Sequence, residues 1–400
     1  MTDAACPTVH TAGLPDLQTC RIMVVDDNRV NRHLLLALLE RDGFRKVEVA
    51  EDGVDALERM TAFRPDLILL DLMMPRMDGF EMCRRLRADP DWQDLPVLVQ
   101  SSLNRAEDRA KAFAAGATDY VTKPLNALEL LARVRIHLQK RALLRDLTQF
   151  RQRTEAELAF ARRMQERLMP GPERCAAVQA ATGIRVDAHF APSSELGGDF
   201  WGMWPDPWHP GRLHLYLVDF SGHGVGAALN TFRLHAILQQ TPFGNGDGPA
   251  EVLAAINRRL CTLLPRGQFA TMLVGEIDPE AGCLRYASAG STKPMVWAPG
   301  DAEPAMGDSA GLPLGLIGQA SYETRELPLP PGGRLFLYSD AAIEIPVGSD
   351  VLDDAGLAAL IAPHLHDPDG ARFLAALTAG LYATGPIDDD LTALLFTRTA

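Results

Sequence analysis

The sequence predicts two folded domains joined by a long helix: an α/β doubly wound domain on a parallel five-stranded sheet, then an α+β layered β-sandwich domain. Between residues 21 and 139, apolar runs such as IMVVD and LILLD alternate with helical stretches, which is typical of a parallel sheet wrapped by helices. From Asn126 to Met169 the chain contains neither glycine nor proline, which predicts one continuous helix. From Ile184 onward, strand-like segments such as LHLYLVD and RLFLYSD are separated by glycine and proline turns.

These patterns also predict the order of the parts along the chain. Two helical stretches are expected within the second domain, at 225–240 and 249–264. The expected segments are a flexible N-terminal tail at 1–20, the first domain at 21–139, a helical or coiled-coil linker at 140–172, and the second domain at 183–398.

The linker carries a weak heptad pattern. Its seam alternates steps of three and four residues, with polar residues at half of the positions, which favours an adjustable homodimer over a single helix lying on its own domain. The seam residues are Leu144, Leu147, Arg151, Thr154, Leu158, Ala161, Gln165 and Leu168.

Composition excludes several functional classes. With 52 acidic and 39 basic residues the net charge is −13, which disfavours binding to nucleic acid or anionic membranes. No basic recognition helix follows the first domain, so a DNA-binding regulator is disfavoured. No apolar run is long enough to span a membrane. The scattered cysteines show no disulfide or metal-finger spacing, so we expect a reducing compartment, the cytoplasm.

A first group of carboxylates is expected at the carboxyl edge of the parallel sheet. Asp26 and Asp27 end one strand and Asp71 ends another, and ligands bind at this edge in open parallel sheets. The mutual repulsion of three carboxylates is relieved by a hard cation such as Mg²⁺, and Asp71 can then attack a phosphoryl donor. Ser101 and Lys123, also at strand ends, supply a hydroxyl and an ammonium group for phosphoryl oxygens.

The motifs VVDDN, LLDLMMPRMDG and AGATDYVTKP resemble the CheY-like receiver domain of two-component response regulators, over residues 21–139. The resemblance implies a histidine kinase or phosphotransfer protein as partner. It also implies these roles: Asp71 as phosphoacceptor, Asp27 as a direct and Asp26 as an outer-sphere Mg²⁺ ligand, the Met73 carbonyl as a further ligand, and Ser101 and Tyr120 as the residues that rearrange on phosphorylation.

A second group of acids follows in the C-terminal half. Asp199, Asp219, Asp340 and Asp389 each adjoin an apolar strand, which suggests a carboxylate cluster at one end of a β structure. Such a cluster holds two hard cations about 4 Å apart, with a bridging water acidified enough to attack a phosphate ester. Trp201, Trp204 and Trp208 follow Asp199, and a substrate-facing ridge and buried packing are equally compatible with their spacing.

The ordered segments GGDFW, VDFSGHG, LFLYSD and DDLTALL resemble the PPM (PP2C) serine/threonine phosphatases of the SpoIIE-like branch. The resemblance implies Mn²⁺ or Mg²⁺ as cofactors and a phosphorylated STAS-type anti-sigma factor antagonist as substrate. It also implies these roles: Asp219 bridging two metals, Asp199 on one metal through water, Asp340 and Asp389 on the other, and the Phe220 carbonyl as an additional ligand.

Three positions depart from that family pattern. Gly202 stands where the family commonly has aspartate, Ala341 stands where it has glycine, and Ser291-Thr292 replaces part of its AGH-x-P segment. If the Ala341 position requires a positive φ, alanine strains the loop by about 1 kcal/mol or more. That strain is expected to lower activity or to require a stronger-binding ion such as Mn²⁺.

The sequence therefore predicts a response regulator whose output is a metal-dependent protein phosphatase. The alternative is a catalytically weak or inactive adaptor that uses the phosphatase fold to bind a sigma factor or its regulator. Four retained aspartates argue against the adaptor, because an unfilled acidic cluster is destabilising. The sequence does not give the kinase, the sign of regulation, the substrate's identity or the physiological metal.

Overall fold

The computed structural model describes residues 17–102, 106–194, 196–222, 224–240, 248–348 and 350–399. Residues 1–16 of the predicted tail lie outside this part, and a 3-10 helix, η1 (Leu17–Thr19), precedes the first strand. The chain divides into two compact units, Met1–Thr154 and Glu155–Ala400. Among the described helices, none combines the length and the apolar content that crossing a bilayer requires.

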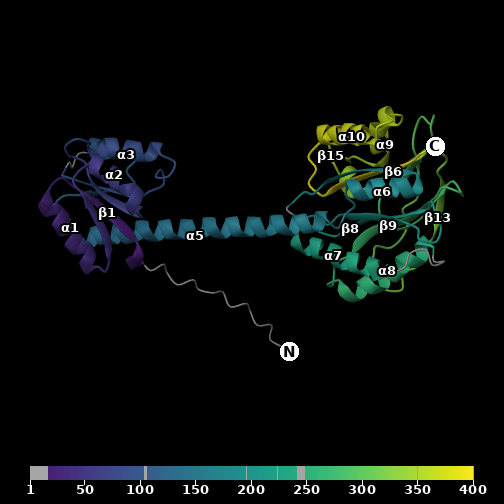
Figure 1. Cartoon of the computed structure of the whole chain (residues 1–400), viewed down its shortest axis with the longest axis horizontal. Coiled ribbons are helices and arrows are strands. Elements are labelled where there is room, and N and C mark those ends of the chain that lie inside the picture. The colour runs from purple at the N-terminus through teal and green to yellow at the C-terminus, as the bar shows by residue number, and fades with distance from the viewer. Residues whose placement is uncertain are drawn as a thin grey trace. The chain divides into compact units, whose positions relative to one another are not determined.

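The first unit is a parallel five-stranded sheet with helices on both faces, as predicted (Figure 1). The strand order is β2-β1-β3-β4-β5. Helices α1 and α5 pack on one face through Leu35, Leu39 and Val134, and helices α2, α3 and α4 pack on the other. The elements are β1 (Arg21–Val25), α1 (Arg29–Arg41), β2 (Lys46–Ala50), α2 (Gly53–Phe63), β3 (Leu67–Asp71), α3 (Gly79–Ala88), β4 (Val97–Ser101), α4 (Ala106–Ala114) and β5 (Asp119–Thr122).

The predicted long helix is present as α5 (Ala127–Glu166), and a separate short helix, α6 (Pro172–Thr182), follows it. Pro170 and Gly171 stand between the two helices, and proline cannot continue a helix. The predicted seam is wrong at its C-terminal end, because Gln165 is buried and Leu168 packs against the core of the second unit. Leu144 and Leu147 are exposed, which leaves that part of the seam open to a partner.

The second unit contains two antiparallel five-stranded sheets, which confirms the predicted layered β-sandwich. Their orders are β13-β10-β9-β8-β7 and β12-β11-β14-β17-β6. Apolar side chains of both sheets, such as Trp201, Leu215 and Leu394, form the core between them. The strands are β6 (Ile184–Ala191), β7 (Phe200–Pro205), β8 (Leu213–Phe220), β9 (Ala270–Asp278), β10 (Cys283–Ala289), β11 (Met295–Trp297), β12 (Ala305–Met306), β13 (Arg325–Pro328), β14 (Arg334–Tyr338) and β17 (Leu391–Arg398), with a small pair β15 (Pro346–Val347) and β16 (Asp350–Val351).

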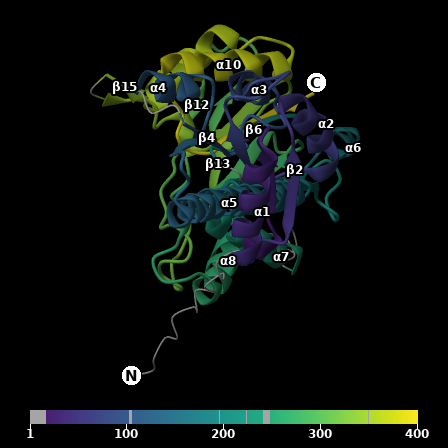
Figure 2. The ribbon, with the colours of Figure 1, turned by 90° about the vertical axis from the view of Figure 1, so that its left-hand side faces the viewer.

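Helices cover the outer faces of this sandwich (Figures 1 and 2). The predicted stretches form α7 (Val225–Gln240) and α8 (Pro249–Leu263), which pack on the first sheet. The sequence reasoning missed α9 (Asp354–Ile361) and α10 (Gly370–Thr384), which pack on the second sheet. Two short 3-10 helices, η2 (Asp340–Ala342) and η3 (Ala362–His364), complete the unit.

Candidate phosphoacceptor and metal sites

The first carboxylate group forms where the sequence predicted it, at the carboxyl ends of β1 and β3. Ligand atoms of Asp26, Asp27 and Asp71 all lie within 4.8 Å of one another. The Lys123 ammonium bridges two of them, with Nζ 2.9 Å from Asp26 Oδ2 and 2.7 Å from Asp71 Oδ2. Oxygen ligands gathered in this way fit a hard divalent cation such as Mg²⁺.

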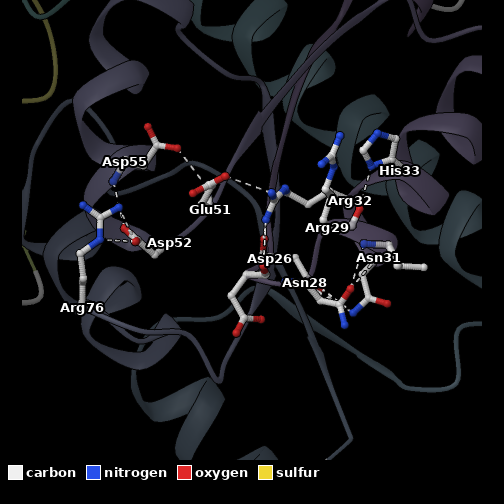
Figure 3. Close-up of polar contacts among 12 residues, drawn as sticks. Asp26, Asn28, Arg29, Asn31, Arg32, His33, Glu51, Asp52, Asp55 and Arg76 are labelled. Atoms are coloured by element: carbon white, nitrogen blue, oxygen red, sulfur yellow. Dashed lines mark hydrogen bonds and ion pairs between the residues drawn. The ribbon is translucent and has the colours of Figure 1, made fainter.

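Asp26 is almost fully buried, and the start of α1 supports its carboxylate. The Asn28 backbone N–H and the Asn31 side-chain amide donate to it, and the Arg32 guanidinium donates to its backbone carbonyl at 2.7 Å. Arg32 in turn pairs with Glu51 at 3.1 Å (Figure 3). The sequence reasoning missed Asn31 and Arg32, because a polar residue on a helix carries no signal of the carboxylate that it faces.

Asp71 is suited to accept a phosphoryl group. Burial raises the pKa of its carboxyl group, the Lys123 ammonium opposes that rise, and the charge of Asp26 adds to it. For Lys123, burial acts to lower the pKa, but its bonds to Asp71 and Asp26 outweigh burial and raise it. The pair therefore places an ammonium donor beside the Asp71 carboxylate, where it can neutralise negative charge.

The other predicted receiver residues lie on β4 and β5 and in the loop after β3. Ser101 ends β4, beside β3, and is buried. Tyr120 on β5 is also buried, and the Arg109 guanidinium lies 6.0 Å from its ring centroid. Met73 is exposed just after β3, and its backbone N–H lies 3.5 Å from Asp71 Oδ1.

An ion pair between the exposed Arg76 and the buried Asp52, which the sequence reasoning missed, fixes the loop after β3. Arg76 adopts φ 59°, an uncommon left-handed conformation, and its Nε donates to Asp52 Oδ2 at 2.5 Å (Figure 3). Asp52 is buried and also caps α2 through the Val54 backbone N–H. The pair ties the loop that carries Met73 to the start of α2.

The second carboxylate group comes from both sheets of the second unit. Asp199 precedes β7, Asp219 lies in β8, Asp340 begins η2 and Asp389 precedes β17. Burial, then the charges of Asp340 and Asp389, raise the pKa of Asp219 to about 8. Burial, then Glu344 and Asp389, raise the pKa of Asp340 to about 6. The structure thus brings all four predicted aspartates into one electrostatic cluster.

Asp199 shows most directly that this cluster lacks positive charge. The side chain is 1% exposed, and burial, then the charge of Asp219, raises its pKa well above the usual range. Its Oδ2 accepts a hydrogen bond from Thr392 Oγ1 at 2.5 Å. Its Oδ1 has no hydrogen-bond partner among the described residues. An orphaned buried carboxylate oxygen beside other acids fits a divalent cation.

Two buried residues fix the Gly197-Gly198 loop that precedes Asp199. Asp390 accepts from the Gly198 N–H at 2.5 Å, and the Gln165 side chain donates to the Gly197 carbonyl at 2.7 Å. Only glycine fits at position 198, because a Cβ there would lie 2.8 Å from the Phe220 carbonyl oxygen. The Phe220 carbonyl therefore lies against the Asp199 loop.

Asp219 and Asp340 line an open cleft of about 260 Å³. Lys293 stands in its wall and pairs with Asp354 at 2.7 Å, and the Tyr338 hydroxyl donates to the same carboxylate at 2.7 Å. Lys293 was not predicted as a site residue. It brings an ammonium group into the wall of a cleft that is otherwise acidic.

Two of the family departures leave the site without strain. Ala341 lies in η2, and the non-glycine residues with positive φ in the described chain are Arg64 and Arg76, so the conditional strain at Ala341 does not arise. Ser291 shares a hydrogen bond with Ser288 at 2.9 Å, and Thr292 donates to the Tyr338 carbonyl. These two hydroxyl groups therefore find hydrogen-bond partners within the cleft wall.

The third departure, Gly202, has a steric cause. A Cβ at Gly202 would lie 2.5 Å from the Tyr216 hydroxyl oxygen, so the tyrosine fills the space that the family's aspartate needs. Of the tryptophans after Asp199, Trp201 is buried in the sandwich core, whereas Trp208 is 52% exposed. Trp204 is partly buried and packs against the core under α7 and α8, so buried packing is right for Trp201 and partly for Trp204.

Comparison with known proteins agrees with the division of the chain into two units. The receiver-domain model of response regulators matches residues 22–135, and the model of stage II sporulation protein E (SpoIIE) matches residues 209–399. The chain is 47% identical over 123 residues to the response regulator MprA of Mycobacterium ulcerans, covering 31% of this chain and 52% of the relative. The Mycobacterium avium MprA is 47% identical over 120 residues, covering 30% and 51%. The chain thus spans about half the length of the curated relatives it matches.

The second unit also resembles a solved structure. The SiaA-PP2C domain of Pseudomonas aeruginosa is 22% identical, with a TM-score of 0.53, covering 62% of this chain and 96% of that one. At that identity the likeness shows a shared PP2C fold. Together with the matched families, it establishes that the chain carries a response regulator receiver domain followed by a SpoIIE-type phosphatase domain.

Proposed function

We propose that the chain is a two-component response regulator in which phosphorylation of Asp71 controls a metal-dependent protein serine/threonine phosphatase. One observation carries the enzymatic part: the orphaned, buried Oδ1 of Asp199 lies in a cluster whose carboxyl pKa values are raised by burial and then by the neighbouring carboxylates. Such a cluster is costly without cations, so its residues are arranged for binding them.

The four aspartates then hold two Mn²⁺ or Mg²⁺ ions. Bound cations of this kind supply a nucleophilic water at neutral pH and stabilise charge on a phosphate ester. Asp199, Asp219, Asp340 and Asp389 would hold the ions, together with the Phe220 carbonyl. Thr392 orients Asp199 through its 2.5 Å hydrogen bond, and Asp390 holds the backbone of the adjoining loop.

The receiver unit accepts a phosphoryl group from a histidine kinase or a phosphotransfer protein. Asp71 is the nucleophile. Lys123 stabilises the transferred group, and Mg²⁺ is held by Asp26, Asp27, Asp71 and the Met73 carbonyl. The buried positions of Ser101 and Tyr120 next to β3 and on β5 suit them to report the change through α5, which begins at Ala127, shortly after β5.

The linker helix supplies a route for control. α5 begins in the receiver unit and ends at the buried Gln165, which holds the loop before Asp199. A shift of this helix would therefore move a metal ligand. Exposed Leu144, Leu147 and Phe150 give α5 an apolar face that suits a homodimer, and a change of dimerisation or helix register is the proposed switch.

The proposed substrate is phosphoserine or phosphothreonine on a STAS-type anti-sigma factor antagonist. The open cleft beside Asp219 admits a side chain presented by a protein surface, and Lys293 in its wall suits the phosphate charge. The choice of a STAS protein rests on family resemblance.

The test is phosphate release from a phosphoserine STAS protein with Mn²⁺ or Mg²⁺. Turnover should be lost in Asp219→Ala and Asp389→Ala and retained in Asp388→Ala, an exposed neighbour of the same charge. An acyl-phosphate mimic on the receiver then gives the sign of control. Equal activity and equal sedimentation with and without the mimic would contradict the switch.

The alternative is an inactive adaptor that binds a sigma factor or its regulator. It predicts no turnover with either ion, in the presence or absence of the mimic, together with retained binding of the partner. Ala341 gives this alternative no support, because it lies in η2 without positive φ.

A further inference from the structure

The second unit contains a pocket of about 300 Å³ whose walls share no residue with the acidic cleft. Its walls come from the chain just after α5, from α6, from β7 and β8, and from the last turns of α7. Leu168 and Leu238 provide apolar surface, while Trp204 and Trp208 provide aromatic surface. This combination of apolar walls with a few polar groups is typical of small-molecule sites.

Three polar groups stand in the pocket walls, on Tyr216, Arg174 and His235. Tyr216 is 5% exposed, yet its hydroxyl makes no hydrogen bond within the described chain. Arg174 forms no ion pair with any described residue, although it is near enough to Tyr216 and His235 to affect the pKa of both. His235 is half-buried, and burial, then the charge of Arg174, lowers its pKa, which leaves it neutral at pH 7.

The Tyr216 hydroxyl is the most telling of the three. This hydroxyl is not one of the fully buried polar atoms that lack a partner, so it keeps contact with solvent at the pocket, where the acceptor atom of a ligand can replace that water. Burial raises the pKa of Tyr216, so the group remains a hydrogen-bond donor. Gly202 lies beside it in the pocket wall, and the absence of a side chain there leaves room for the hydroxyl itself.

The aromatic walls favour a flat ligand. The Trp204 ring lies 5.9 Å from the Tyr216 ring, tilted by 48°, and stacks on His214 at 5.7 Å. Trp208 is half exposed at the rim, where a planar ring can stack on it. A guanidinium and a hydroxyl donor beside these rings favour an anionic substituent.

We propose that this pocket binds a small planar aromatic anion, of the kind represented by a nucleoside monophosphate or an aromatic carboxylate. The ring lies against Trp204 and Trp208, and the anionic group accepts from the Tyr216 hydroxyl and the Arg174 guanidinium. The site is independent of the proposed phosphatase chemistry, since its residues lie outside the acidic cluster.

Calorimetric titration of the full chain in EDTA tests the proposal. Adenosine monophosphate and indole carboxylate are the probes, and the stronger of the two identifies phosphate or carboxylate as the preferred anion. Adenosine, which has the ring without the charge, and ribose phosphate, which has the charge without the ring, should bind about tenfold more weakly or worse.

Tyr216→Phe removes only the hydroxyl and should weaken binding about tenfold. Arg174 is exposed, so the Arg174→Gln variant should fold normally. It should bind the probe more weakly by a similar factor. Arg163→Gln, on another exposed arginine, should bind as the wild type does. The proposal is overturned if neither probe binds, or if both pocket variants bind as tightly as the wild type.

Discussion

Gln165 and Gly197 hold each other through both ends of the glutamine amide. Gln165 Nε2 donates to the Gly197 carbonyl at 2.7 Å, and the Gly197 N–H donates to Gln165 Oε1 at 3.3 Å. The same Nε2 lies 3.2 Å from Thr231 Oγ1 on α7. One buried side chain therefore joins the last turn of α5 to the loop before Asp199 and to the helix that covers the first sheet.

Gln165→Ala should uncouple α5 from the metal loop. Removing a buried partner leaves the Gly197 groups unsatisfied, which should destabilise the second unit by about 1–3 kcal/mol. Metal-dependent phosphatase activity should fall further than this loss of stability explains. Urea unfolding and phosphate release measure the two effects. Gln152→Ala, an exposed glutamine on the same helix, serves as control, and equal behaviour of the two variants would refute the coupling.

Asp390→Ala should impair the site although Asp390 is not proposed as a ligand. Its carboxylate accepts from the Gly198 N–H and from Ser193, so its loss frees the loop before Asp199. We expect about 2–4 kcal/mol of destabilisation, by the cost of unpaired buried groups, and weaker Mn²⁺ binding. Calorimetric titration with Mn²⁺ measures that affinity. Asp388→Ala, which removes an exposed charge, should change neither the stability nor the affinity for Mn²⁺. An equal loss of affinity in this variant would show that the effect comes from net charge.

The metal-free second unit should lose stability as the pH rises. The folded pKa of Asp219 is raised from 3.8 to about 8, so the folded state binds more protons than the unfolded state between these values. The free energy of unfolding therefore falls across this pH window. Urea midpoints in EDTA, followed by tryptophan fluorescence, should decrease from pH 5 to pH 8.

Two further measurements sharpen this test. Asp219→Asn should make the urea midpoint in EDTA depend less on pH, because the substitution removes the carboxyl group whose pKa is raised most clearly. Added Mn²⁺ should raise the midpoint more at pH 8 than at pH 5, because a cation binds the ionised carboxylates. A midpoint that rises with pH in EDTA would show that the cluster is solvated rather than strained.

Gly202→Asp should not restore the family pattern. The Tyr216 hydroxyl oxygen would lie 2.5 Å from the new Cβ, and overpacking of this kind costs about 1–3 kcal/mol. Adding Tyr216→Ala to the Gly202→Asp variant should relieve the clash. The double variant should therefore lose less stability than the sum of the losses of the two single variants. Gly226→Ala is the control, because a Cβ there meets nothing within 4 Å. Thermal unfolding of the four variants measures the coupling.

Much of the fold could be predicted because its signals are local. Alternating strands and helices at 21–139 specify a doubly wound sheet, and Pro170 ends the region where a long helix is possible. Helices α9 and α10 were missed. Helix α10 packs on β6, which lies far earlier in the chain, as well as on the adjoining β17, so the surface that selects the apolar face of the helix was not visible.

Some residues of the candidate site could likewise be predicted from the sequence, and others could not. The four aspartates could be found because each follows or precedes an apolar strand. Gln165 and Thr392 could not, because their roles depend on contacts with residues far along the chain. The Thr392 hydroxyl and Asp199, for example, are 193 residues apart in the sequence.

The place of β17 has a consequence for synthesis of the protein. This strand lies between β14 and β6, and Asp389, Asp390 and Thr392 stand at its start. The receiver residues leave the ribosome first and can fold while translation continues. The acidic cluster cannot form until β17 has emerged, so a nascent chain would acquire its proposed phosphorylation site well before its proposed catalytic centre.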